Sequence, residues 1–236
     1  HYGDFIATVN GHAGGRGRVV FVAHAPYFLI LREAIHLKRL GYRVSLVSLG
    51  EINAHLRPLF EDHFDAVTDL QGNYRLLRAL LAELEPDVFH VQCWMWFTIL
   101  GRMAIEAKGD AVAVCEFYDV TSVYAERDVL ATNWPPGVID FEFAMEDYVL
   151  HHGDGVITRF PDFVIGEWRD RFGAMAPHLR MQAYPCPDLS LTGIGNCPTA
   201  GVRPACCSPA GWFPWTRATR RPFFPKRVCP RPSGPY

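Results

Sequence analysis

The sequence predicts a Rossmann-like α/β fold, a parallel sheet with helices on both faces, over residues 18–187. Two observations predict it. Short apolar runs alternate about six times with segments of helical periodicity, and the connections between them are short. The first run, RVVFVAHAP, is a short, largely apolar run of β-branched and aromatic residues, which is typical of a strand buried on both faces of a parallel sheet.

The first elements follow from short local patterns. Residues 18–26, RVVFVAHAP, have the length and composition of a buried strand, and residues 27–40 have the apolar spacing of a helix. Gly41 stands where a helix C-cap is expected. A second strand is expected at 42–50, YRVSLVSLG, and a weaker third strand at 64–70, FDAVTDL.

The second half of the domain continues the alternation. Asn73 can cap a helix with a leucine stripe, and this helix must end at Glu85, because a residue before proline is disfavoured in the helical region. The remaining elements are strands at 87–94, 111–120, 155–161 and 178–185 and helices at 95–108, about 138–152 and about 162–172.

Charge divides the chain near residue 188. The formal net charge is −2, but all 25 acidic residues lie at or before Asp188, and 7 of the 23 Lys and Arg residues lie after it. The body is therefore acidic and residues 189–236 are basic. The same segment holds 9 of the 18 prolines and 4 of the 7 cysteines. Two different kinds of sequence meet at this point.

The sequence predicts three parts. Residues 1–17 end in the glycine-rich GHAGGRG and are expected to form a flexible arm. Residues 18–187 are expected to form the α/β domain, and residues 188–236 a disordered tail. We interpret the tail as the product of a shifted reading frame in a GC-rich gene. A basic, aromatic arm for nucleic acid or membrane surfaces and a cysteine framework are the alternatives.

Several function classes lack their motifs. The sequence has no P-loop and no Gly-x-Gly-x-x-Gly after the first strand, so no nucleotide cofactor is expected. It also has no Gly-x-Ser-x-Gly, the nucleophile elbow of α/β hydrolases. It also lacks Cys-x2-Cys, and His90 and Cys93 should face opposite sides of their strand, so no metal site is expected. No apolar stretch is long enough to span a membrane and no signal peptide is recognised, so a cytoplasmic location is expected.

Ligands of such sheets bind beyond the carboxyl ends of the strands. Polar residues at the expected strand ends are therefore the candidate site: His24, Gly50, His90 to Trp94, Tyr118, Asp119 and Arg159.

Three segments, in this order, carry a resemblance. They are RVVFVAHAP with its helix and GYRVSLVSLG, then EPDVFHVQCWMW, then CEFYDVTSVYAERD, and the helix VIDFEFAMEDYVLHHGDGVIT adds to them. Together they resemble the N-terminal, acceptor-side domain of family 4 retaining glycosyltransferases, which have the GT-B fold. The resemblance covers roughly residues 18–187. It implies transfer of a sugar from a nucleotide-sugar donor to an acceptor hydroxyl.

The resemblance also implies roles for individual residues. His90 matches the histidine of the family's Pro-Asp-Val-x-His strand, and Asp119 stands where the family often has His-Asp, with Tyr118 in place of the histidine. These two are the candidate catalytic residues, able to orient or deprotonate an acceptor hydroxyl. The candidate substrate-binding residues are His24, Gln92, Tyr118, Arg127 and Arg159, of which the arginines suit phosphate or carboxylate groups.

The family's donor-side features are not found. The sequence contains no Glu-x7-Glu, so the chain is expected to be a fragment that is inactive alone. Its expected partners are the nucleotide-sugar donor and the acceptor of the intact enzyme. No specific nucleic-acid partner and no transmembrane segment are expected, while peripheral membrane contact is compatible with the basic tail. The alternatives are a non-catalytic α/β binding module whose tail binds anionic partners, and another GT-B enzyme such as a sugar-nucleotide epimerase.

Overall fold

A computed structural model describes residues 2–12, 14–26, 28–117, 122, 127–158, 166, 170 and 179–181. The predicted helix at 162–172, the tail at 188–236 and the ends of the predicted strands at 118–120 and 159–161 lie wholly or largely outside these residues. In the described part of the chain, none of the helices combines the length and apolarity that crossing a membrane requires.

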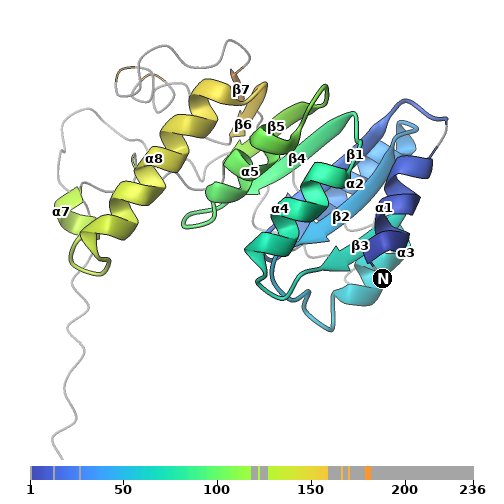
Figure 1. Cartoon of the computed structure of the whole chain (residues 1–236), viewed down its shortest axis with the longest axis horizontal. Helices are drawn as coiled ribbons and strands as arrows, with labels where there is room; N and C mark the ends of the chain where they lie inside the picture. The colour runs from blue at the N-terminus through green and yellow to red at the C-terminus, as the bar shows by residue number, and fades with distance from the viewer. Residues whose placement is uncertain are drawn as a thin grey trace, which may run out of the picture. The chain divides into compact units, whose positions relative to one another are not determined.

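A parallel sheet of seven strands forms the centre of the fold (Figure 1). The strands are β1 Arg18–Ala23, β2 Arg43–Ser48, β3 Ala66–Asp69, β4 Val88–Cys93, β5 Val112–Phe117, β6 Gly155–Thr158 and β7 Leu179–Met181. Their order across the sheet is β3-β2-β1-β4-β5-β6-β7, and every pairing is parallel. The predicted Rossmann-like sheet is confirmed, with each strand inside or overlapping its predicted range.

Helices cover both faces of the sheet. The helices α2 Phe28–Arg39 and α3 Arg57–His63 pack on one face, where Phe21, Leu46 and Phe60 form a buried core. The opposite face is covered by α1 Tyr2–Gly11, α4 Tyr74–Glu83, α5 Ile99–Ala107 and α8 Pro136–His152. Along β1, successive residues alternate between these two cores because side chains alternate across a strand. A short helix, α7 Arg127–Leu130, precedes α8.

Two predicted helix boundaries are confirmed, one by a hydrogen bond and the other by the backbone conformation of a glycine. The side-chain oxygen of Asn73 accepts from the backbone N–H of Leu76 at 3.0 Å, which satisfies one of the free donors at the start of α4. Gly41 follows α2 with a φ of 91°, the left-handed conformation that favours glycine after a helix. Asn73 therefore caps the start of α4, and Gly41 provides the turn that ends α2, as the sequence predicts.

The N-terminal segment differs from the prediction of a flexible arm over residues 1–17. Residues 2–11 form α1, and Phe5 and Val9 on this helix are buried in the core. The Asn10 side chain donates to the carbonyl of Glu83 and accepts from the backbone N–H of Glu85, which ties α1 to the end of α4. Glycines at both ends of this helix hid it in the sequence, because tertiary packing rather than helix propensity stabilises it.

Gly101 sets how closely α5 can approach the sheet. A Cβ atom at this position would lie 2.7 Å from Cys93 Sγ and 2.9 Å from a methyl group of Val149. We therefore predict that Gly101→Ala lowers the free energy of unfolding by about 1–3 kcal/mol, although alanine favours a helix. Gly137→Ala in α8 is the matched control: a Cβ there meets no atom within 4 Å, so no loss is expected. Urea unfolding measures both, and equal effects would contradict the packing argument.

Candidate functional site

The strand order places a topological switch point between β1 and β4. From β1 the chain continues through β2 to β3 at one edge, and it then returns to β4 on the other side of β1. The register pairs Phe21 of β1 with His90 of β4. At such a reversal the connections leave the two strands in opposite directions, which opens a crevice at their carboxyl ends where ligands of α/β proteins bind.

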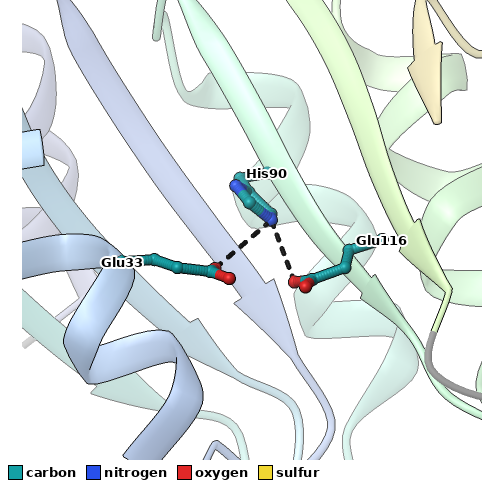
Figure 2. A group of neighbouring side chains, drawn as sticks. All are labelled: Glu33, His90 and Glu116. Atoms are coloured by element: carbon teal, nitrogen blue, oxygen red, sulfur yellow. Dashed lines mark hydrogen bonds and ion pairs between the residues drawn. The ribbon is translucent and has the colours of Figure 1, made fainter. Parts of the chain in front are cut away.

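Three ionisable side chains meet beside this switch point (Figure 2). Glu33 comes from α2, His90 from β4 and Glu116 from β5. His90 Nε2 donates a hydrogen bond to Glu116 Oε2 at 3.1 Å and lies 3.6 Å from Glu33 Oε2. The side chains of His90, Glu116 and Glu33 are 11%, 1% and 20% exposed. We call these three residues the Glu33–His90–Glu116 cluster.

The alternation of the strands explains why the cluster forms. Phe89, Val91 and Cys93 of β4 pack into the core under α4 and α5, so His90 must point to the other face, toward α2. There its ring stacks on Phe21, with ring centroids 4.7 Å apart and planes 22° apart. The predicted separation of His90 and Cys93 onto opposite faces is confirmed.

Burial shapes the acid–base chemistry of the cluster. Burial is the main reason why the pKa of the Glu33 carboxyl is raised to about 7. Repulsion from Glu116 raises this pKa further, whereas attraction to His90 lowers it. Burial alone would lower the pKa of His90, but the hydrogen bond to Glu116 and the two negative charges raise it above its ordinary value. The cluster can therefore hold and exchange protons near neutral pH. Imidazole and carboxylate are also common ligands of divalent metals.

A second buried carboxylate organises the loop that follows β4. Glu142 of α8 accepts from the backbone N–H of Trp96 at 3.1 Å and from the hydroxyl of Thr98. Thr98 precedes α5, so Glu142 supplies the cap that the Thr98 side chain does not make itself. Trp96 has a φ of 70°, which is rare for a bulky residue, and its ring contacts Trp134 with centroids 4.4 Å apart. This aromatic loop lies at the carboxyl end of β4.

The structure brings two of the predicted site residues to one face of β4. His90 lies in the cluster, and Gln92 is buried two residues further along, opposite Glu116 in the strand register. His24 follows β1 and stacks on Phe97 of the loop after β4, with ring centroids 3.5 Å apart. Burial lowers the pKa of His24, which favours the neutral imidazole. These residues surround the switch point from both central strands.

Arg127 has partners within the protein. Its guanidinium forms an ion pair with Asp140 and lies over the ring of Phe143, 5.0 Å from the centroid. Both side chains of this ion pair are more than half exposed, so the pair does not exclude a ligand contact. Tyr118, Asp119 and Arg159, the other predicted site residues, lie outside the described part of the chain.

Sequence reasoning missed Glu33, Glu116 and Glu142. Glu116 carried a signal, because an acid inside an otherwise apolar strand such as AVAVCEF must find a partner when it is buried. Glu33 and Glu142 carried a weaker signal, since each lies on a helix among apolar residues that face the sheet. Their partners come from distant segments, so the sequence alone did not join them.

Comparisons with known proteins do not identify a family for this chain. No protein-family model matches the chain, and no curated protein matches it significantly. A structure of a sucrose-phosphate synthase from Thermosynechococcus elongatus is 12% identical over 74% of this chain and 93% of that chain, with a TM-score of 0.40. The crystal structure of AibC is 14% identical over 78% of this chain, which spans about half (54%) of that chain, with a TM-score of 0.34. The fold assignment rests on the strand order and helix layers, not on these likenesses.

Glu142 provides a pH test of how the loop after β4 is held. Burial raises the pKa of this carboxyl, against the hydrogen bonds from Thr98 and Trp96. A raised folded-state pKa contributes stability below the ordinary value of 4.5, and this contribution is lost as the pH rises through the folded-state value. We predict that the unfolding free energy of the wild type falls relative to Glu142→Gln as the pH rises from about 4.5 toward neutrality. Urea unfolding across this range measures it. If the unfolding free energy of the wild type instead stays constant or rises relative to that of Glu142→Gln over this pH range, burial does not raise the pKa of Glu142.

Proposed function

We propose that this chain is the acceptor-side half of a family 4 retaining glycosyltransferase of the GT-B type. In the intact enzyme, a sugar would pass from a nucleotide-sugar donor to an acceptor hydroxyl. The order of the segments that resemble the family supports the proposal, and so does the Rossmann-like sheet into which they fold. The donor pocket of that family lies in a second domain that carries Glu-x7-Glu, a motif that these 236 residues do not contain.

The environment of His90 is the observation that carries the proposal. His90 ends the Pro86-Asp87-Val88-x-His motif, lies beside the switch point and has one ring nitrogen held by Glu116. A carboxylate that holds one imidazole nitrogen fixes the tautomer and orientation of the ring, which leaves the other nitrogen to accept a proton. We assign His90 to orienting or deprotonating the acceptor hydroxyl, together with Asp119.

Other residues near the carboxyl ends of the strands would bind the substrates. His24 follows β1, and Gln92 lies two residues after His90 on β4. We assign them to acceptor or donor contacts along with Tyr118 and Arg159. We keep Arg127 in this group as a candidate for phosphate or carboxylate contacts, because its ion pair with Asp140 is exposed to solvent.

The encoding DNA tests the proposal without an assay. We predict that one forward frame after about codon 188 continues with alternating strand and helix patterns, acidic residues and Glu-x7-Glu. Translation of all three frames from codon 180 onward checks this. If no frame carries such a domain, the donor-side half has no source in this gene, and the binding-module alternative replaces the glycosyltransferase.

Activity gives the second test. The 236-residue chain should release no nucleoside diphosphate from a panel of nucleotide-sugars, because its sequence does not contain the Glu-x7-Glu motif of the family's donor domain. The chain joined to the downstream domain should release it, and His90→Asn should slow that release by about 10²–10⁴-fold, the usual contribution of a positioned acid or base. His36→Asn, at an exposed position of α2, is the matched control and should keep the full rate. Turnover by the 236-residue chain, or an unchanged rate in His90→Asn, would contradict the proposal.

A further inference from the structure

The donor atoms of the Glu33–His90–Glu116 cluster have the spacing of ligands around a single ion. One nitrogen and two carboxylate oxygens all lie within 4.8 Å of one another, and His90 Nε2 is 3.1 Å and 3.6 Å from the nearest oxygens of Glu116 and Glu33. Two ligands that each lie about 2.1 Å from a tetrahedral metal are roughly 3.4 Å apart. The two nitrogen–oxygen distances bracket that value, so small side-chain shifts would admit an ion.

Hydrogen bonding leaves the cluster incomplete. Nε2 of His90 carries at most one proton, which it donates to Glu116. Glu33 Oε2 is buried and accepts no hydrogen bond within the described part of the chain, although it lies 3.6 Å from the same nitrogen. A buried carboxylate oxygen without a donor is costly. A cation between the three groups would satisfy both carboxylates and the imidazole at once.

We propose that Glu33, His90 and Glu116 form a binding site for one divalent transition-metal ion. The site does not depend on the glycosyltransferase assignment, since it follows from the three side chains alone. With the ion bound, His90 acts as a ligand through Nε2, and its stacking on Phe21 fixes the ring for that contact. Nδ1 then carries the ring proton, so in this state His90 can orient an acceptor hydroxyl but cannot deprotonate it.

The ligand types narrow the choice of ion. One imidazole and two carboxylates suit Zn²⁺, Mn²⁺ or Fe²⁺, and Zn²⁺ is the tightest binder of these three in the usual affinity order. Three protein ligands leave at least one position for water or a substrate oxygen, as in catalytic rather than structural zinc sites. Glu33 is the most exposed of the three side chains, and the positive charge of Arg32 beside it tempers the negative charge of its carboxyl.

The test must separate this site from the other metal-binding side chains of the chain. The sequence has 7 cysteines and 10 histidines, and thiolates bind Zn²⁺ tightly. Co²⁺ distinguishes the two kinds of site, because a thiolate ligand adds an intense charge-transfer band in the near ultraviolet and a site of nitrogen and oxygen ligands does not. The full chain, stripped of metal with a chelator and then dialysed, is titrated with Zn²⁺ by calorimetry and with Co²⁺ by absorption.

Three variants and one control complete the design. We expect the wild type to bind one more equivalent of Zn²⁺ than His90→Gln and Glu116→Gln. Glu33→Gln should lower the affinity for this additional Zn²⁺ ion by at least about tenfold, because even the loss of an outer-shell partner costs about 10–100-fold in metal affinity. His36→Gln removes an exposed histidine from the same helix as Glu33 and should bind like the wild type. The matching Co²⁺ equivalent should show visible bands without thiolate charge transfer.

Two results would overturn the site. The first is that the wild type and Glu33→Gln bind the same number of Zn²⁺ ions with the same affinity. Of the three substitutions, this one is the least expected to disturb folding, because the Glu33 side chain is partly exposed. The second needs no variant: a wild-type Co²⁺ spectrum in which every equivalent shows thiolate charge transfer would assign all binding to cysteines.

Discussion

The pairing of β1 with β4 is the constraint on which the rest of the structure depends. These two central strands are almost fully buried, so every side chain along them must meet a helix on one face or the other. Parallel pairing also requires a crossover between successive strands, which is why helices follow the strands on both sides. The same pairing marks where the chain reverses its direction across the sheet, and so it determines where a ligand crevice can form.

Charged groups inside such a sheet need partners, and their arrangement follows from this need. His90 and Glu116 lie on neighbouring strands and face the same side, so each provides the other's hydrogen bond, and Glu33 reaches them from α2. Glu142 meets the same requirement on the other face by capping α5. A core built for stability alone would place apolar residues at these positions, because replacing buried ion pairs with well-packed apolar groups is often neutral or stabilising. The retained charges therefore point to chemistry at the switch point.

Local patterns predicted most of the fold, because buried strands and leucine-striped helices each leave a direct trace in the sequence. The start of α4 at Asn73 and the end of α2 at Gly41 were predictable for the same reason, since caps are local chemistry. The helix α1 was not, because Phe5 and Val9 become core residues only when α4 is beside them. The site was half predictable. The family resemblance identified His90, although this residue lies in the middle of β4 and not at the expected strand end. Glu33 and Glu116 join it only through the register of the sheet and the packing of α2.

A double-mutant cycle on His90 and Glu116 tests the central claim, that these residues form one buried, mutually dependent unit beside the switch point. Unfolding free energies of the wild type, His90→Phe, Glu116→Leu and the double variant are measured in urea with a chelator present. Each single change leaves a buried polar group without its partner, while the double change leaves an apolar pair that can stack on Phe21. We predict that the double variant loses about 1–3 kcal/mol less unfolding free energy than the sum of the losses in the two single variants. Additive effects, within about 0.5 kcal/mol, would contradict it.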